Sequence, residues 1–298
     1  MTARWLRWMV FVLLAWSTAW LVVAVRGGGP WAWLAMLLPL LVPGLIVGFQ
    51  FLMARWTNRT AGEPLPSWGA VLRGWWVEWW LSILVFGWLQ PFRAKAYPDR
   101  LEPTLGRRGV VLVHGFSCNR AMWWTWLRAL TRSGRCFVAV DLSPPWGPIE
   151  AHVGVLDDAV QSVQAATGMA PVVVCHSMGG LVARAWLGES GRAEQAHRIL
   201  TFGTPHGGTR LAQLDFTARG RQMLPGHPWL QALDKALPRE ARARFACWYS
   251  DCDSIVFPVR TASLAGATNR PANGLAHMEM AFDTTLRNEA FAISELDA

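Results

Sequence analysis

The sequence predicts an α/β domain with a mostly parallel sheet, preceded by a hairpin of two membrane-spanning helices. Two long apolar runs come first, and between Met1 and Ala54 the charged side chains are Arg4, Arg7 and Arg26. Short β-branched runs then alternate with helical segments, which is typical of a parallel sheet covered by helices on both faces. One strand-like run, "VVVCHS" at 172–177, ends at a serine that a helical pattern follows directly.

The two apolar runs extend from Trp5 to Val25 and from Trp31 to Met53. At 1.5 Å per residue, each is long enough to cross about 30 Å of hydrocarbon. A signal peptide is the alternative for the first run, but its apolar stretch is too long, no small-residue cleavage site follows, and a second run comes directly after. We therefore expect a transmembrane hairpin at 1–57, with a tight turn at "RGGGP" and a second helix kinked by Pro39 and Pro43.

A third apolar run, 68–88, is rich in tryptophan and contains Arg73 and Glu78. Tryptophan favours the membrane–water interface, and a charge at the centre of a spanning helix costs about 2.5–3.5 kcal/mol. The two charges lie about 140° apart on a helix, so we expect that one protein contact cannot easily shield both. These features favour a helix on the membrane surface within an interfacial segment and linker at 58–104; a third span is the alternative.

Charge predicts the orientation of the hairpin. Arg4 and Arg7 precede the first run, Arg55 and Arg59 follow the second, and Arg26 lies between the runs. The positive-inside rule then places both ends of the hairpin, and the domain that follows it, in the cytoplasm of a bacterium with the hairpin in its inner membrane. Five cysteines, an odd number without a CxxC pair, agree with a reducing compartment.

The net charge of +8 fits an arginine-rich surface beside an anionic membrane. Nucleic-acid binding would require a basic face with interleaved exposed aromatic residues. Here the arginines are scattered and the aromatic residues lie in apolar runs, so we expect the lipid bilayer, and no nucleic acid, as a partner.

The remaining chain, 105–298, reads as one α/β domain. The expected strands are 109–116, 136–142, 172–176, 198–205, 243–250 and, more weakly, 262–267. The expected helices are 120–134, 149–168 with Gly168 as its C-cap, 178–190 and 278–291. The stretch 207–242 has no strand pattern and follows a strand end, where a cap over a binding site would sit.

Ser177 is the expected nucleophile. A serine at a sharp strand-to-helix turn has its hydroxyl exposed above the sheet, and the close approach of the two backbones requires small neighbours. The pattern G-x-S-x-G of such a turn is present here as "CHSMG" (175–179), with Cys175 at its first position. The alternative is a small turn-forming serine without a catalytic role.

The sequence resembles the α/β-hydrolase superfamily, in particular its bacterial lipase and esterase branch, over about 105–295. The resemblance rests on "VLVHGF", "CHSMGG", "TFGTPHGGT", "RQMLPGHPWLQAL", "YSDCDSIVFP" and "GLAHMEM". It implies the α/β-hydrolase fold with a small cap, and a Ser-His-Asp triad that cleaves carboxylic esters.

The order Ser…Asp…His within this fold selects the other triad members. His277 follows the last expected strand and precedes the last helix, so it is the expected base; His114 and His176 more readily orient the backbone. Asp253 is the expected acid, with Asp251 as the alternate. The resemblance also implies the backbone N–H groups of Phe116 and Met178 as the oxyanion hole.

The expected substrate is a lipid-like or other apolar acyl ester. Trp123, Met223, Leu224 and Trp229 are candidates to contact it, and core packing is the alternative for Trp123. We expect no metal and no cofactor, because no His/Cys/Asp cluster has ligand spacing. An acyltransferase with the same triad and a non-catalytic membrane module with a hydrolase fold are the alternative functions.

Overall fold

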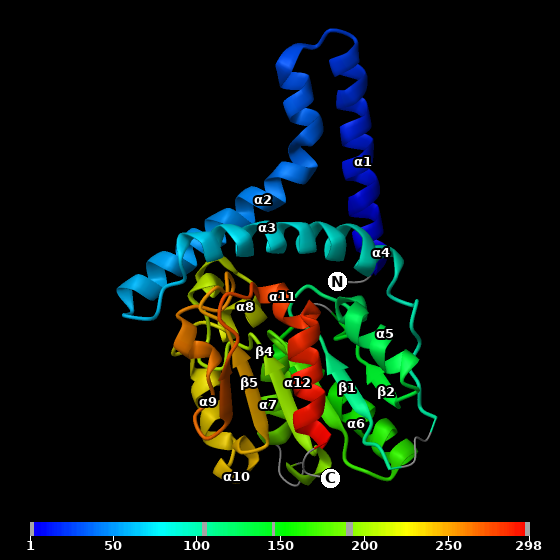
Figure 1. The fold of residues 1–298 in the computed structure, drawn as a ribbon, viewed down its shortest axis with the longest axis vertical. Helices are drawn as coiled ribbons and strands as arrows, with labels where there is room; N and C mark the ends of the chain where they lie inside the picture. The colour runs from blue at the N-terminus through cyan, green and yellow to red at the C-terminus, as the bar shows by residue number, and fades with distance from the viewer. Residues whose placement is uncertain (1–2, 103–105, 145–146, 189–192, 296–298) are drawn as a thin grey trace.

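Six parallel strands form one sheet in the computed structural model, which describes residues 3–102, 106–144, 147–188 and 193–295. The order across the sheet is β2-β1-β3-β4-β5-β6, so the chain passes over one strand, β1, on its way from β2 to β3 (Figure 1). The strands are β1 (Val110–Val113), β2 (Phe137–Ala139), β3 (Val172–His176), β4 (Arg198–Phe202), β5 (Phe245–Tyr249) and β6 (Thr268–Pro271). The predicted α/β-hydrolase fold is confirmed.

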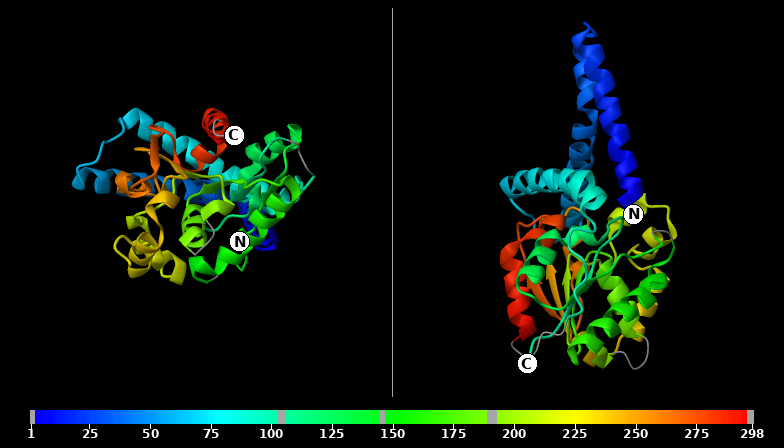
Figure 2. Two further views of the ribbon diagram at one scale, coloured as in Figure 1. Left: turned by 90° about the horizontal axis from the view of Figure 1, so that it is seen from below. Right: turned by 90° about the vertical axis from the view of Figure 1, so that its right-hand side faces the viewer.

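Alternate residues of each strand face opposite sides of the sheet and form two separate cores. Val111 and Val173 belong to the core under α6 (Val153–Thr167), α7 (Gly179–Gly188) and α9 (Pro228–Ala236). Val110 and Val172 belong to the core under α5 (Trp124–Arg132), α11 (His277–Phe282) and α12 (Thr284–Glu295). The sheet lies between these two layers of helices (Figure 2). Both faces of the strands β1 to β5 are buried, which explains why these strands are mostly apolar in the sequence.

Short helical turns lead into two of the expected helices. The turn η2 (Arg120–Trp123) precedes α5, and η3 (Ile149–His152) precedes α6. The helix α6 ends at Gly168, whose φ of 69° gives the predicted left-handed C-cap. The expected cap consists of η5 (Arg210–Leu214), α8 (Ala218–Gln222), α9 and α10 (Arg239–Arg242), and η4 (Ala193–Gln195) precedes β4.

The last strand lies later in the chain than predicted. Of the residues expected as a strand, 262–267, the first is the end of η6 (Val259–Ala262), and the others form the turn that follows it. The side chain of Asn269 fixes that turn, because its Oδ1 accepts from Leu264 N and its Nδ2 donates to Leu264 O, both at 2.9 Å. The true strand, β6, is a mostly exposed edge strand with the polar sequence TNRP, so no apolar run marks it.

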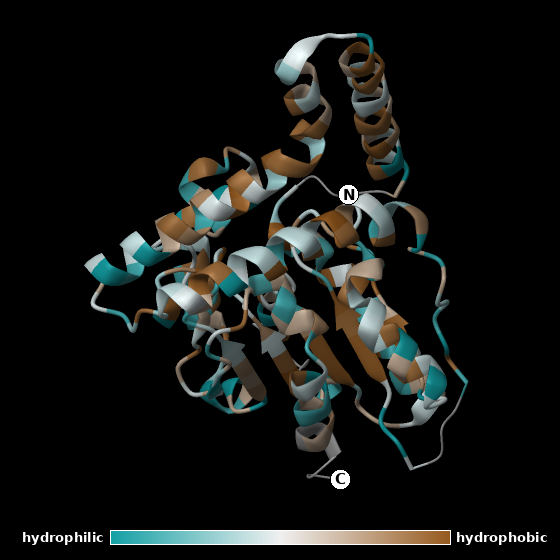
Figure 3. Cartoon of the chain, turned by 45° about the horizontal axis from the view of Figure 1, so that its top comes forward, coloured by the Kyte–Doolittle hydropathy of each residue, from teal (hydrophilic) through white to brown (hydrophobic). Residues whose placement is uncertain are grey.

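Two long helices precede the α/β domain and project away from it (Figure 1). They are α1 (Ala3–Val25) and α2 (Gly29–Thr60), and both are long and apolar enough to cross a membrane. Their outer surfaces expose apolar side chains such as Phe11, Leu14 and Leu45, and hydrophobic residues predominate along both helices in Figure 3.

The helix α2 changes direction along its length (Figure 1), and it contains Pro39 and Pro43. Proline has no N–H, so Pro39 leaves the carbonyl of Ala35 without its helical donor. Trp16 of α1 supplies the missing donor, since its Nε1 lies 2.8 Å from Ala35 O. The kink expected from the sequence is therefore accommodated by a side-chain hydrogen bond between the two helices.

The tryptophan-rich segment forms α3 (Trp68–Leu84), which continues through a π-helical turn η1 (Val85–Leu89) into α4 (Gln90–Phe92). Figure 1 shows α3 lying between the hairpin and the sheet. Towards α2, Trp75 and Trp79 donate to Gly44 O and Leu40 O at 2.8 and 2.9 Å. Towards the domain, Val85 and Leu89 join the core that contains Val110.

Both charges of this segment contact the same helix, but only one of them is shielded: Glu78 is 3% exposed, whereas the side chain of Arg73 is 51% exposed. Arg73 Nη1 donates to Glu279 Oε2 at 2.9 Å, and Glu78 accepts from Met278 N at 3.0 Å. Both partners lie in α11, and the long arginine side chain spans the angular separation on α3. The predicted boundary between 104 and 105 lies outside the described residues.

Candidate active site

Ser177 stands at the turn between β3 and α7. Its φ of 54° places it in the left-handed region, where Ser117 is the other non-glycine residue among those described. Such a backbone costs about 1–3 kcal/mol and persists only where surrounding contacts fix it. Gly179 is required because a Cβ there would lie 2.5 Å from Val113 O of β1. The geometry is that of the strained elbow that the sequence predicts.

The neighbouring strand fixes this turn through two hydrogen bonds. Ser177 N donates to Phe202 O at 2.9 Å, and Thr204 Oγ1 donates to Ser177 O at 2.8 Å. Thr204 follows the end of β4, within the motif "TFGTPHGGT". Sequence reasoning did not assign a role to Thr204, although its motif was recognised.

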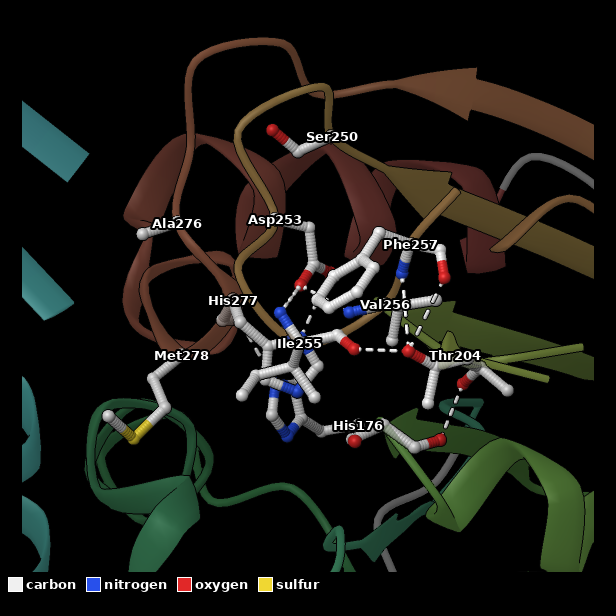
Figure 4. Close-up of polar contacts among 12 residues, drawn as sticks. His176, Thr204, Ser250, Asp253, Ile255, Val256, Phe257, Ala276, His277 and Met278 are labelled. Carbon is white, nitrogen blue, oxygen red and sulfur yellow. Dashed lines mark hydrogen bonds and ion pairs between the residues drawn. The ribbon is translucent and has the colours of Figure 1, made fainter. Parts of the chain in front are cut away.

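His277 and Asp253 form a buried pair. His277 Nδ1 and Asp253 Oδ2 are 2.9 Å apart, and their side chains are 5% and 1% exposed (Figure 4). Asp253 Oδ1 accepts from the N–H groups of Ile255 and Val256, at 2.8 and 2.9 Å. The carboxylate is thereby held in one orientation and bonds the imidazole through one oxygen, as a triad acid requires.

Opposing effects act on the pKa of His277. Burial lowers it, while the charge and hydrogen bond of Asp253 and the charge of Glu78 raise it, and the net pKa lies above the usual 6.5. The stabilised species is the imidazolium, which is the form a histidine takes after it has accepted a proton.

The alternate acid, Asp251, lies elsewhere in the same loop. Its Oδ1 accepts from Gly274 N at 2.8 Å, so it joins the loop after β5 to the loop that precedes α11. Gly203 lies against the pair that does form: a Cβ there would come within 2.9 Å of His277 Nδ1 and 3.0 Å of Asp253 Oδ2. The structure brings Asp253, and not Asp251, to the histidine.

His114 and His176 hold the backbone around the site. His114 accepts from Leu142 N through Nε2 at 3.1 Å, and its Nδ1 lies 2.9 Å from Gly115 O. His176 Nε2 lies 3.0 Å from His277 O, and their rings are 4.6 Å apart. Burial lowers the pKa of His114 to about 4 and that of His176 well below its usual value, so both rings are neutral. These contacts match the backbone role predicted for both residues.

Of the two residues expected to form the oxyanion hole, Met178 is next to Ser177 in the chain, and Phe116 is next to Gly115, which lies against Ser177. Met178 directly precedes the first residue of α7, where the first backbone N–H groups have no intrahelical acceptor. Phe116 belongs to the loop after β1, and a Cβ on its neighbour Gly115 would lie 2.7 Å from Ser177 Cβ. Glycine therefore allows this loop to approach the serine.

A cavity of about 1020 Å³ opens above the end of the sheet, and both Ser177 and His277 line it. The α/β domain contributes the loop after β1, parts of the cap, and the residues around Ser177, Ile255 and His277. The rest of the wall comes from outside that domain, and consists of Pro43, Ile46, Val47 and Gln50 of α2 with Glu78, Ser82 and Phe86 of the α3 segment. Sequence reasoning did not foresee this wall; the signal that pointed to it was the acidic residue Glu78 inside an apolar run.

Of the four candidate substrate contacts, Met223 lines this cavity. Trp123 is fully buried in the core beside α5 and does not line it. Leu224 and Trp229 pack against the core on the opposite face of the sheet, and they also lie outside the cavity wall. The apolar side chains that do reach the wall from the cap include Leu211, Leu214 and Phe216.

Within the part of the chain that the structure describes, no group of three His, Cys, Asp or Glu side chains is placed to hold a metal ion. The titratable groups at the cavity are Glu78, Cys118, His176, Asp215 and His277. Together with Ser177 and Asp253, they can support nucleophilic attack assisted by a base.

The Alpha/beta hydrolase family matches residues 110–290, and the chain belongs to that family. Among solved structures, a Bacillus licheniformis lipase in mature form has a TM-score of 0.58 at 15% identity, over 66% of this chain and 96% of the lipase. Aspergillus fumigatus lipase B has a TM-score of 0.50 at 16% identity, over 59% of this chain and 49% of that chain. No curated protein sequence matches the chain. At these identities, the similarity to lipases shows a shared fold.

Proposed function

We propose that this chain is a membrane-anchored serine hydrolase that cleaves carboxylic esters of lipid-like or other apolar acyl groups. The observation that carries this proposal is the shared cavity: Ser177 and His277 face the space whose other wall is built by α2. A nucleophile and base at the bottom of a largely apolar cavity suit an ester with a long acyl chain.

In the proposed reaction, His277 accepts the proton of Ser177 as its Oγ attacks the ester carbonyl carbon. The oxygen of the tetrahedral intermediate accepts from the N–H groups of Phe116 and Met178. The imidazolium then protonates the departing alcohol as the C–O bond breaks, which leaves an acyl-Ser177. A water molecule, deprotonated by His277, attacks this ester, and the proton returns to Ser177 as the carboxylic acid leaves.

The position of the cavity supports access from the bilayer. Ile46 of α2 is 53% exposed, and the cap residues Leu214 and Phe216 are 55% and 82% exposed, although all three line the cavity. Apolar side chains exposed beside an apolar hairpin are stabilised when lipid covers them. We infer that the acyl chain enters between α2 and the cap.

We expect the Ile46→Trp variant to lose activity on long acyl chains. Chromogenic esters of increasing chain length, assayed with detergent-solubilised protein, should show a preference for longer chains in the wild type. The larger side chain narrows the cavity where α2 lines it. We therefore expect kcat/KM for the longest ester to fall by about tenfold, while kcat/KM for the acetate ester stays near the wild-type value.

Leu45→Trp is the matched control, because Leu45 is the adjacent residue of α2, is 71% exposed, and does not line the cavity. Equal losses in both variants, or no change in the chain-length profile of Ile46→Trp, would contradict access along α2.

We further propose that α1 and α2 span a bacterial inner membrane and that the catalytic domain lies in the cytoplasm. The arginines at the two ends of the hairpin support this orientation, and all five cysteines are free and buried. The contacts of Arg73 and Glu78 with α11 support two spans rather than three, because they join α3 to the catalytic domain.

A reporter fused after Ala298 tests this orientation in a bacterial host. With two spans, a fused alkaline phosphatase should be inactive and a reporter that folds in the cytoplasm should be active. The opposite pattern would mean that the run from 68 to 88 crosses the membrane.

A further inference from the structure

Glu78 is a buried carboxylate that the proposed triad does not use. It belongs to α3, outside the family-matched residues, and is 3% exposed. Both of its carboxylate oxygens lie 3.0 Å from Met278 N, and the side chain lines the same cavity as Ser177 and His277. The residue whose N–H it accepts directly follows the proposed base.

A second residue of α3, Arg73, contacts the residues around His277 from the more exposed side of the helix. Arg73 Nη1 donates to Glu279 Oε2 at 2.9 Å and to Gly274 O at 3.2 Å. The side chain of Arg73 is 51% exposed, whereas Glu78 is enclosed. The helix α3 therefore holds the turn around His277 through one outer and one buried polar contact.

The charged groups around Glu78 favour an electrostatic link to the base. His277, Asp253 and Glu279 interact with its carboxylate, and the ion-paired Arg73 lies on the same helix. Burial raises the pKa of Glu78 to about 7, while His277 and the N–H of Met278 act against that rise. The charge of Glu78 in turn raises the pKa of His277, so an ionised Glu78 favours the imidazolium.

We propose that Glu78 is a positioning residue for the catalytic base: it fixes the backbone at Met278 and stabilises the imidazolium that forms when His277 accepts the serine proton. This inference rests on the proposed function of Ser177 and His277. It makes α3 part of the active site, so the segment that joins the domain to the hairpin also sets the protonation of the base.

The Glu78→Gln variant tests the proposal, because its amide oxygen can still accept from Met278 N while the charge is lost. An imidazolium without the nearby carboxylate is less stable, so the pKa of His277 should fall. Activity requires the neutral ring, and the acid limb of kcat/KM against pH should therefore move about one unit to lower pH. We also expect kcat on the plateau to fall several-fold with KM nearly unchanged. An acid limb at the wild-type position would overturn the proposal.

Arg73→Gln is the matched control, since it removes the other contact between α3 and α11 and leaves Glu78 in place. Its acid limb should stay at the wild-type pH, and an equal shift in both variants would overturn the proposal. If Glu78→Gln does not fold, as judged by thermal unfolding, the Glu78→Asp variant replaces it. The shorter side chain moves the carboxylate away from His277, so the acid limb should shift to lower pH by a smaller amount. An unshifted acid limb would overturn the proposal. A wild type without ester hydrolysis contradicts the proposed function itself, and this inference falls with it.

Discussion

Replacing Ser177 by alanine is expected to lower kcat for ester hydrolysis by about 10⁶, the size of loss that removal of a triad serine causes. The proposed mechanism passes through an acyl group on Ser177 Oγ, and alanine offers no atom to carry it. The measurement is steady-state hydrolysis of a chromogenic ester by detergent-solubilised protein, with thermal unfolding as a check of the fold.

Ser254→Ala is a suitable control for this experiment. Ser254 is also buried and lies beside Asp253, but its Oγ has no hydrogen-bond partner among the residues that the structure describes. We expect this variant to keep wild-type activity. Residual hydrolysis by Ser177→Ala at more than a few per cent of the wild-type rate would contradict the role of Ser177.

The second large effect is expected for Asp253→Asn, which should lower kcat by about 10⁴. An asparagine amide can present an N–H to His277 Nδ1, which favours the tautomer with its proton on Nε2, where the serine proton has to go. The amide also lacks the charge that stabilises the imidazolium. Single-turnover or steady-state kinetics near neutral pH measure this loss.

Asp251→Asn is the control, because Asp251 lies two residues away and accepts from Gly274 N rather than from a histidine. We expect a loss of less than tenfold. A severe loss in Asp251→Asn with a mild loss in Asp253→Asn would exchange the roles of the two residues.

The strands β1 to β5 could be predicted because both faces of these strands are buried. Residues such as Val110 and Val111 face opposite cores, and the resulting apolar runs are visible in the sequence. The edge strand β6 has no such run: its residues are mostly exposed, and β5 pairs with it through backbone atoms. Backbone pairing leaves little trace in side-chain polarity. The sequence therefore predicts the last strand at 262–267, whereas β6 is Thr268–Pro271.

The order of chemistry-bearing residues along the chain pointed to Ser177, Asp253 and His277, because each follows a strand of a parallel sheet. Their side chains therefore meet at one edge of that sheet. The resemblance to the family favours Asp253 over Asp251, which lies two residues earlier in the same loop, and the sequence keeps Asp251 as the alternate. In the structure, Asp253 Oδ2 contacts His277 Nδ1.

The wall formed by α2 and α3 could not be predicted from local patterns. Glu78 and Met278 are 200 residues apart in the chain, and their contact depends on how α3 packs on the finished domain. The angle between Arg73 and Glu78 was calculated for an isolated helix. In the structure both side chains reach α11: Glu78 accepts from Met278 N, and the long side chain of Arg73 extends to Glu279. The cost expected for two charges in an apolar helix is offset by partners that only the tertiary structure supplies.

The central claim is that Ser177 is a nucleophile activated within the cavity, and a fluorophosphonate probe tests it most directly. Wild-type protein in detergent or native membranes is incubated with the probe and then digested with a protease. Mass spectrometry identifies the labelled peptide. We predict a single covalent adduct on Ser177, which is absent from Ser177→Ala and retained in Ser254→Ala. Equal labelling of the wild type and Ser177→Ala, or an adduct on another residue, would contradict the account.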